Sequence, residues 1–329
     1  MKNRTNKIYF VHQGLLSFVR RDLEILRCYY ETREINNYTG AFLKIPRNIS
    51  DVIWCDIIFC WFGSVRFLFP ILLGRILGKK VVIVAGGYDV VRLPEIGYGS
   101  LCGRLRSQLQ KGLFKLANHV ICVSKSNMQE AMNNAAIPEN KIRMIYHGFD
   151  VPLGDCQNKE RVVITVGKVS EENLRRKGIG MFIEAARCFP NIPFLVIGAI
   201  DSMVKEKIER DIPGNVRLRG YVTGNELEDY FKRAKVYVQA SMHEGFGCAV
   251  AEAMLNKCVP VVSDCFALPE VVGEAGFVFK PDDLGNLKEK LDQALRSDPG
   301  RGDFAKRYIE ERFPLGKRKK ALLDLIDSL

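Results

Sequence analysis

The feature that most constrains the fold is a regular alternation of short, apolar, β-branched runs with segments of helix length. The runs are NKIYFVHQ, DIIFCW, KKVVIVAGG and HVICVS in the first half of the chain, and RVVITVGK, PFLVIGA, NVRLRGYV, VYVQAS, VPVVSD and GFVFK in the second. Continuous apolar strands separated by helices are typical of parallel sheets that helices cover on both faces. The alternation therefore predicts two doubly wound α/β domains, with binding residues in the loops beyond the carboxyl ends of the strands.

The length of the chain also favours two domains, because 329 residues exceed the ~100–200 residues of one typical domain. The segment HGFDVPLGDCQNKE interrupts the alternation with glycine, proline and polar residues, which is typical of a domain boundary. We expect one domain over residues 1–152 and a second over residues 153–300. Residues 301–329 have helical character, and we expect these helices to pack back toward the first domain.

Composition is that of an ordinary soluble globular protein, with 47% hydrophobic and 26% charged residues. The ten cysteines are scattered singly, without any C-x-x-C pair, and the first residues, MKNRTNKIYFVHQG, lack the pattern of a secretory signal peptide. Scattered cysteines are typical of a reducing compartment, where cysteine serves as a small buried hydrophobe. We therefore expect a cytoplasmic protein.

Positive charge is concentrated in the first half of the chain. Residues 1–150 hold 21 lysines and arginines against 11 aspartates and glutamates, whereas residues 151–329 hold 28 against 27. A basic half indicates an anionic partner such as a membrane surface, a phosphorylated lipid or a nucleic acid, and the alternative is a basic face that serves only solubility. We expect no nucleic acid, because the chain has no helix-turn-helix signature, zinc finger or RNP-like aromatic strand.

The longest apolar stretch, Ile57 to Leu77, is long enough to span a bilayer. Arg66 near its centre, with Gly63 and Pro70 inside it, argues against a spanning helix. The stretch instead predicts a buried strand followed by a strongly apolar helix packed against a sheet. The alternative is that this helix lies on a membrane interface, attached peripherally to the inner face of the membrane. Basic residues that flank the helix support this alternative, and they are Arg66, Arg75, Lys79 and Lys80.

The segment ASMHEGFGCAVAEAM, residues 240–254, joins the end of a strand to a helix through Gly245 and Gly247. Glycines at such a turn allow a close approach of the backbone, and the N–H groups at a helix start bind phosphate. Glu252 lies about one turn into this helix, where its carboxylate can accept hydrogen bonds from a vicinal diol such as ribose. Glu244 precedes the anion site and would meet the group attached beyond the phosphates.

A cluster of cations lies upstream, in TVGKVSEENLRRKG. Lys168 follows a strand, and Arg175, Arg176 and Lys177 precede Gly178 at the start of the next helix. Fixed cations beside an anion site neutralise a diphosphate leaving group, as the transfer of a sugar from a nucleotide requires. Taken alone, the cluster is typical of a solvated surface, but together with the two glutamates it indicates sugar transfer.

In these motifs the sequence resembles glycosyltransferase family 4, a group of retaining enzymes with two facing Rossmann-like domains, the GT-B architecture. The resemblance covers most of the chain and is strongest from about Val162 to Lys290. Its hallmark is the E-x7-E motif, which runs here from Glu244 to Glu252. Other segments that resemble the family are VGK…RRKG, GYVTGNELEDYFKRAKVYVQAS, PVVSDCFALPEVVGEAGFVF, ANHVICVSKSNMQEA and ENKIRMIYHGFD.

The resemblance implies an acceptor-binding first domain, a donor-binding second domain and an active site in the cleft between them. Glu244 would contact the donor sugar and support an oxocarbenium-like transition state, and Glu252 would bind the ribose. Lys177 matches the pyrophosphate lysine of the family, and Lys168 stands where many members have arginine. The rest of the implied donor site comprises backbone N–H groups, a base-packing pair and a flexible loop, namely Phe246, Gly247, Cys248, Ala249, Tyr221, Val222 and Gly14.

The chain departs from the family at the end of one strand of the first domain. Many members carry a histidine there, near the primary hydroxyl of the sugar, whereas VVIVAGGYDV has glycines, Tyr88 and Asp89. Asp89 and His12 are therefore the candidates for the acceptor side, and for Asp89 the alternative is a helix cap or a turn. No pair of histidines has metal-ligand spacing with a carboxylate, so we expect no metal and no cofactor besides the nucleotide-diphospho-sugar, which is a co-substrate.

The expected function is that of a retaining glycosyltransferase that moves a sugar from a nucleotide-diphospho-sugar to a hydroxyl acceptor. The acceptor would be a glycan or a lipid-phosphate-linked molecule in the assembly of a cell-surface polysaccharide, glycolipid or glycoprotein glycan. The alternatives are a non-hydrolysing sugar-nucleotide epimerase and a non-catalytic sugar- or nucleotide-binding subunit. A nicotinamide dehydrogenase is disfavoured, because no G-x-G-x-x-G follows the first strand of either half.

Overall fold

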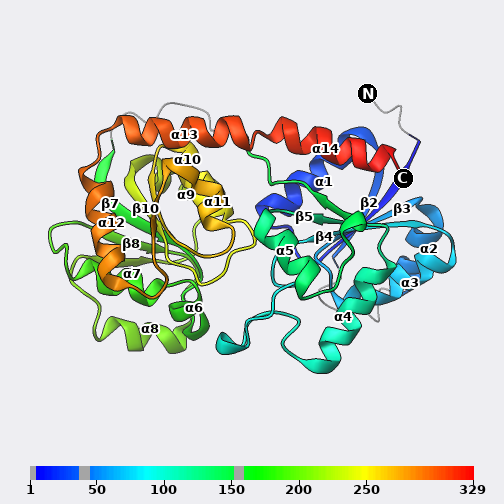
Figure 1. The fold of residues 1–329 in the computed structure, drawn as a ribbon, viewed down its shortest axis with the longest axis horizontal. Coiled ribbons are helices and arrows are strands. Elements are labelled where there is room, and N and C mark those ends of the chain that lie inside the picture. The colour runs from blue at the N-terminus through cyan, green and yellow to red at the C-terminus, as the bar shows by residue number, and fades with distance from the viewer. Residues whose placement is uncertain (1–4, 37–44, 152–158) are drawn as a thin grey trace. The chain divides into compact units, whose positions relative to one another are not determined.

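The structure is a computed structural model that describes residues 5–36, 45–151 and 159–329. The chain divides into two units (Figure 1). Unit 1 comprises Met1–Gly148 together with Leu315–Leu329, and unit 2 comprises Phe149–Pro314. In sequence, unit 2 is thus inserted between two segments of unit 1.

Unit 1 is built on a parallel sheet with the strand order β2-β1-β3-β4-β5-β6. Its strands are β1 (Lys7–His12), β2 (Glu31–Asn36), β3 (Ile57–Trp61), β4 (Lys80–Ala85), β5 (His119–Cys122) and β6 (Ile142–Met144). Helices lie on both sides of the sheet (Figure 1), and they are α1 (Ser17–Tyr29), α2 (Ile45–Trp54), α3 (Leu68–Ile76), α4 (Arg104–Leu116), α5 (Lys125–Asn133) and α14 (Leu315–Asp327). Strand β1 pairs with β2 on one side and with β3 on the other, so the strand order reverses between β1 and β3, at the switch point of the sheet.

The central strands of unit 1 are buried because both faces of the sheet are covered. Every residue of β3 is buried, and β1 and β4 are buried after their first lysines. Phe10 of β1 stacks on Phe59 of β3 with ring centroids 5.5 Å apart, and these two residues are direct partners in the parallel register. The edge strand β2 differs, because only Ile35 of its sequence ETREIN is buried.

The C-terminal helix α14 is tied to unit 1 by a buried ion pair. Arg318 donates to both carboxylate oxygens of Asp22 in α1, at 2.6 Å each. The same guanidinium donates to the backbone carbonyl oxygens of Ile145 and Tyr146, and the indole N–H of Trp61 donates to Asp22 at 2.9 Å. These hydrogen bonds replace water around both charges, which is the condition under which a buried ion pair is tolerated.

Unit 2 is built on a second parallel sheet, with the strand order β12-β11-β10-β7-β8-β9. Its strands are β7 (Glu160–Val166), β8 (Phe194–Ile197), β9 (Val216–Arg219), β10 (Ala234–Gln239), β11 (Val259–Ser263) and β12 (Phe277–Phe279). Its helices are α6 (Glu171–Arg176), α7 (Ile179–Ala186), α8 (Ser202–Glu209), α9 (Gly224–Arg233), α10 (Cys248–Leu255), α11 (Leu268–Val272), α12 (Leu284–Arg296) and α13 (Gly300–Arg312). Strand β7 pairs with β8 and with β10, so the switch point of this sheet lies between β7 and β10.

The prediction of two doubly wound α/β domains is confirmed, because both sheets are wholly parallel and helices alternate with the strands. Each run predicted to be a strand forms one. Strands β2 and β6, the two edges of the first sheet, were not predicted, because most of their side chains lie in solvent and the sequences ETREIN and IRM lack an apolar run.

The domain boundaries differ from those expected. The predicted boundary, between residues 152 and 153, lies outside the described residues, and the chain passes from unit 1 to unit 2 between Gly148 and Phe149. Helix α13 was expected to pack toward the first domain, but it belongs to unit 2, where it packs against α10. Helix α14 does return to unit 1, where the Arg318–Asp22 ion pair holds it.

The apolar stretch from Ile57 to Leu77 forms β3, a 3₁₀ turn over Val65–Phe67 and α3, which agrees with the predicted strand and helix. None of the helices in the described ranges is long and apolar enough to cross a membrane.

The prediction that cysteine serves as a buried hydrophobe holds for only part of the set. Cys60 and Cys122, which lie in strands, are buried, as are Cys55 and Cys258, each of which lies between a helix and a strand. The exposed cysteines are Cys28, Cys102 and Cys188.

Replacing Arg318 with methionine is expected to destabilise unit 1, because it leaves the Asp22 carboxylate buried without its cation. Loss of one partner of a buried ion pair costs about 3–5 kcal/mol. Both tryptophans of the chain, Trp54 and Trp61, lie in unit 1, so urea unfolding followed by tryptophan fluorescence reports on this unit. The matched control is Lys320→Met, an exposed cation on the same helix. A loss in Arg318→Met no larger than in the control would contradict the assigned role of the ion pair.

Candidate active site

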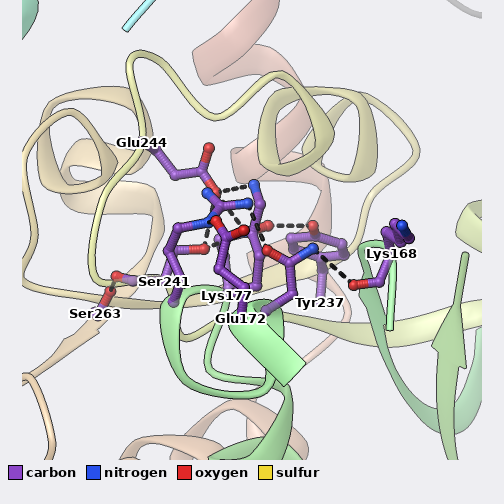
Figure 2. A network of polar contacts seen from close by, with 10 residues as sticks. Lys168, Glu172, Lys177, Tyr237, Ser241, Glu244 and Ser263 are labelled. Atoms are coloured by element: carbon purple, nitrogen blue, oxygen red, sulfur yellow. Dashed lines mark hydrogen bonds and ion pairs between the residues drawn. The ribbon is translucent and has the colours of Figure 1, made fainter. Parts of the chain in front are cut away.

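Glu244 lies at the switch point of the second sheet, in the loop that follows β10. Three donors reach its Oε1 atom: the Lys177 ammonium at 2.5 Å, the Ser241 hydroxyl at 2.8 Å and the Gln239 amide at 2.9 Å. Figure 2 shows the second carboxylate oxygen pointing away from these donors. This oxygen, Oε2, accepts no hydrogen bond from residues that the structure describes, so it is available to a ligand.

Lys177 reaches Glu244 because the turn between α6 and α7 passes close to the end of β10. Gly178 in this turn has φ +66°, and a Cβ atom built on it would lie 2.1 Å from the carbonyl oxygen of Ala240. The approach therefore requires glycine. The backbone N–H of Met242 donates to the carbonyl oxygen of Arg176 at 2.8 Å, which fixes the two loops to each other.

The charges around Glu244 keep it ionised. Burial alone raises the pKa of its carboxyl, but the Lys177 ammonium, the hydrogen bonds from Lys177 and Ser241, and the charge of Arg176 outweigh burial and hold this pKa below its usual range. The site therefore presents a carboxylate and an ammonium side by side. A carboxylate stabilises a positive charge that develops on a sugar ring, and an ammonium stabilises phosphate.

A line of buried polar side chains supports Glu244 from one face of β10 and its continuation. The Tyr237 hydroxyl donates to Oε1 of Gln239, whose amide donates to the Ser241 hydroxyl at 2.7 Å as well as to Glu244. The Ser263 hydroxyl in β11 donates to the Ser241 carbonyl oxygen at 2.6 Å, and Figure 2 shows this network beneath Glu244. Burial, followed by the charges of Glu244 and Glu252, raises the pKa of Tyr237, so its hydroxyl remains a donor.

Reasoning from the sequence missed Tyr237, Gln239 and Ser241. The signal was present in VYVQAS, where these polar residues alternate with two valines and an alanine. A period of two places them on one face of the strand. In a central parallel strand, which is buried on both faces, such alternation marks a polar network rather than a solvent-facing side.

The predicted phosphate-binding helix start is that of α10. Its cap residue, Gly247, has φ +97°, and no side chain in the described part of the chain caps the helix. Cys248 and Ala249 are half-buried in the first turn, and Glu252 is half-buried one turn further on. The charges of Glu252 and Glu244 both act on the Tyr237 hydroxyl, so the two glutamates of the motif lie near one buried group.

The side chain of Phe246 packs among other aromatic rings. It is buried between Phe149, at a ring-centroid distance of 6.0 Å, and Phe313, at 5.3 Å. Its side chain thus belongs to the core of unit 2, and the backbone is what it can offer a ligand.

Lys168, Tyr221 and Val222 lie in loops beyond the carboxyl ends of β7 and β9. Lys168 is exposed, its ammonium makes no hydrogen bond or ion pair with the described residues, and Figure 2 shows it apart from Glu244. Its backbone carbonyl oxygen accepts a hydrogen bond from the Asn173 amide at 2.8 Å. Tyr221 is 80% exposed and Val222 is half-buried. The structure therefore brings Lys177 to Glu244. No hydrogen bond or ion pair among the described residues joins Lys168, Tyr221 or Val222 to this pair.

His12 and Gly14 lie at the switch point of the first sheet. His12 ends β1 and is buried, and its Nδ1 atom accepts the backbone N–H of Gly14 at 3.0 Å. Gly14 has φ +149°, and a Cβ atom built on it would meet nothing within 4 Å. The loop after β1 therefore borders open space. Because these residues belong to unit 1, their participation in a site shared with Glu244 stays a prediction.

Asp89 holds together the loops that follow β3 and β4. Its carboxylate accepts the backbone N–H of Gly63 at 2.7 Å and those of Gly86 and Gly87 at 3.0 Å each. Burial raises the pKa of Asp89 to about 6, against the lowering effect of these hydrogen bonds. The carboxylate faces backbone rather than solvent, which matches the turn alternative considered for this residue.

Within the described residues, no group of three or more histidine, cysteine, aspartate or glutamate side chains is placed to hold a metal ion. Reaction without a metal stays a prediction.

Residues 155–311 match the family model of group 1 glycosyl transferases. This range is slightly less than half of the chain, and it contains the whole Lys177–Glu244 site. We call it the glycosyltransferase segment.

Relatives agree with this match. Over 102 residues the chain is 38% identical to O-antigen chain mannosyltransferase B of Escherichia coli, an alignment that covers 31% of this chain and only 27% of that protein. A longer alignment, of 307 residues at 25% identity, covers 87% of this chain and 80% of an uncharacterized glycosyltransferase of Methanocaldococcus jannaschii.

The fold is also similar to that of a solved structure. The crystal structure of Anabaena HepE in complex with UDP and glucose superposes with a TM-score of 0.80 at 17% identity, covering 98% of this chain and 100% of that one. Together with the two parallel sheets, this similarity confirms the two-domain α/β fold that the resemblance implied.

Replacing Lys177 with methionine is expected to raise the pKa of Glu244, because burial then acts without the nearest cation. In the wild type, ionised Glu244 contributes stability that is present above the unfolded-state pKa and is lost as the pH falls through the lowered folded-state pKa. The variant loses this contribution, so its deficit in Tm relative to the wild type should grow as the pH rises from 3 to 7. Thermal unfolding at several pH values measures it.

The matched control is Lys232→Met, which removes the half-buried partner of Glu228 on α9. Its deficit in Tm should change little with pH. An equally flat profile for Lys177→Met would refute the coupling between Lys177 and Glu244.

Proposed function

We propose that this chain is a retaining glycosyltransferase that moves a sugar from a nucleotide-diphospho-sugar to a hydroxyl acceptor. The observation that carries the proposal is the Lys177–Glu244 pair, which lies at the switch point of a parallel sheet within the glycosyltransferase segment. Open α/β sheets bind nucleotides at such points.

In the proposed reaction, the acceptor hydroxyl attacks the anomeric carbon from the side of the leaving diphosphate. The bond from the anomeric carbon to the diphosphate oxygen breaks as the new glycosidic bond forms, and the hydroxyl proton passes to the leaving oxygen. Lys177, supported by Lys168, stabilises the charge on the diphosphate, while Glu244 stabilises the positive charge on the sugar ring. The buried network of Tyr237, Gln239 and Ser241 holds the Glu244 carboxylate in place through hydrogen bonds.

The remaining residues around this pair suit a nucleotide. Glu252 would accept hydrogen bonds from the ribose, and the start of α10, from Gly247 to Ala249, would donate N–H groups to phosphate. Tyr221 and Val222 would pack against the base. A uracil nucleotide is the first to test, because the similar HepE structure holds UDP and glucose. No metal is needed in this proposal, since Lys177 and the helix start supply the positive charge.

Nucleotide binding is expected to raise Tm, because a ligand of the folded state at ~100 Kd adds about 2.7 kcal/mol of stability. UDP, GDP, ADP and TDP are compared, each without metal. The preferred nucleotide should shift Tm in the wild type and in Glu244→Gln, and Glu252→Ala should reduce the shift.

Glu244→Gln is further expected to slow the release of sugar from the corresponding nucleotide-sugar to water by about 100-fold, the scale of losing one preorganised electrostatic group. Proton NMR of the released sugar reports the rate and the anomeric configuration, which should be retained. Glu206→Gln, an exposed residue on α8, is the control. Unchanged release in Glu244→Gln would refute its catalytic role, and nucleotide binding without sugar release from any donor would favour a binding subunit.

We further propose that unit 1 attaches peripherally to an anionic lipid bilayer, at the inner face of the membrane, through α2 and α3. The outward face of α3 is apolar, with Phe69 41%, Leu72 41% and Ile76 80% exposed, and on the adjacent α2 Ile53 is 60% exposed. Lys79 donates to the carbonyl oxygen of Ile53 at 3.1 Å, so basic and apolar groups meet on this surface. An apolar face with a basic rim is complementary to an anionic membrane.

Leu72→Ser/Ile76→Ser is expected to weaken binding to vesicles of phosphatidylcholine and phosphatidylglycerol by about tenfold, since it removes apolar area that the bilayer would bury. Co-sedimentation measures the binding, which should also fall at high salt. The control is Met203→Ser, an exposed apolar residue on α8 of unit 2. If the double variant sediments with vesicles as well as the control does, α3 is not the contact surface.

A further inference from the structure

Unit 1 contains a cavity of about 370 Å³ that is separate from both switch points. It lies between α4, the loop that follows β4 and the end of α5. Its lining includes three cations, Arg92, Arg104 and Lys111, and no aspartate or glutamate. The cations make no hydrogen bond or ion pair with residues in the described ranges, so their charge is not neutralised within unit 1.

The lining is preorganised by backbone contacts. Next to Arg92, the N–H groups of Val90 and Val91 donate to the carbonyl oxygen of Gly87 at 2.9 and 3.1 Å. The Asn134 side chain at the end of α5 donates to the carbonyl oxygen of Val90 at 3.0 Å. The cations are therefore carried by a fixed loop and by a helix, which lowers the entropic cost of binding an anion.

Helix α4 presents three different faces. Residues 104, 107, 108 and 111 follow the i, i+3, i+4, i+7 spacing and line the cavity. The next stripe carries Leu105, which is 76% exposed, and Leu109, which is 44% exposed. The third face packs into unit 1 through Leu113 and Phe114. No acidic residue occurs anywhere in this helix, whose sequence is RLRSQLQKGLFKL.

This arrangement fits a ligand that is anionic at one end and apolar at the other. Two guanidinium groups and an ammonium match the several oxygens of a phosphate, which arginine binds through two parallel hydrogen bonds. Leucines that are exposed beside the same cations would cost free energy in water, and they suit a hydrocarbon chain. A free anion would contact the cations but would bury neither Leu105 nor Leu109.

We propose that this cavity, the α4 pocket, binds the phosphate headgroup of a lipid whose hydrocarbon chain lies along Leu105 and Leu109. The assignment of this lipid as the glycosyl acceptor rests on the proposed function, whereas the binding itself does not. The acceptor class would then be a lipid-linked phosphate or diphosphate, brought to unit 1 from a membrane.

Binding to phosphatidylcholine vesicles that contain phosphatidic acid is compared with binding to vesicles of equal surface charge that contain cholesteryl hemisuccinate, a carboxylate lipid. The wild type should prefer the phosphate lipid. Arg104→Gln and Lys111→Gln should each weaken binding to it by about tenfold, the scale of one charged hydrogen bond. Lys115→Gln is the matched control, because it makes the same change four residues further along α4, outside the pocket. All three positions are accessible to solvent, and Tm confirms that the variants fold.

Calorimetric titration with inorganic phosphate tests whether the pocket binds a lipid headgroup or free phosphate. The proposal expects inorganic phosphate to bind at least about tenfold more weakly than the phosphate lipid. Equal affinity would overturn the lipid assignment, and phosphate-lipid binding that is the same in Lys111→Gln, Arg104→Gln and Lys115→Gln would overturn the pocket itself. Nucleotide binding by unit 2 is measured in the same samples. If the protein binds nucleotide but shows no preference for the phosphate lipid, the α4 pocket is refuted and the proposed function is not. If the wild type binds no nucleotide, the proposed function is refuted.

Discussion

The ion pair between Lys177 and Glu244 depends on a close approach of two backbone segments. They are the loops that follow β7 and β10, the strands between which the strand order reverses. The carboxyl ends of β7 and β10 are neighbours, so the loops that follow these strands begin side by side. Gly178 lets the first loop pass against the carbonyl oxygen of Ala240. Once the loops meet, a largely buried carboxylate and an ammonium lie together, and the polar side of β10 donates the hydrogen bonds that water would otherwise supply. The chemistry of the site thus follows from topology and one glycine.

The sequence predicted most of the fold because the strands at the centre of each sheet are apolar runs. It did not predict β2 or β6, since an edge strand with one buried residue carries no such pattern. Glu244, Glu252 and Lys177 were found because their motifs have a fixed spacing. Gln239 and Ser241 were missed, because a polar residue in a buried strand is explained only by the partner it meets. The α4 pocket could not be predicted either, since Arg92 joins Arg104 and Lys111 only through the course of the loop between them.

The charge asymmetry between the two halves has a structural counterpart. The second half carries nearly equal numbers of both signs, and many of its cations are paired with acidic side chains, as in Lys177–Glu244, Arg233–Glu160 and Lys232–Glu228. In unit 1, several cations lie instead beside exposed apolar side chains on α3 and α4. This arrangement in unit 1 concentrates cations next to leucines, isoleucines and a phenylalanine, which is the chemistry of a surface that meets amphiphiles.

The Arg318–Asp22 ion pair also affects the order in which the two units fold during synthesis. Its guanidinium is supplied by α14, which follows the whole of unit 2 in sequence. During synthesis, unit 2 can therefore be completed at the ribosome while Asp22 still awaits its partner, so the unit that is started first is finished last. The same order limits how chimaeric proteins can be made. A donor unit taken from another protein has to replace an internal segment, Phe149–Pro314, with α14 left in place, because a simple exchange of the C-terminal half would separate the two buried charges.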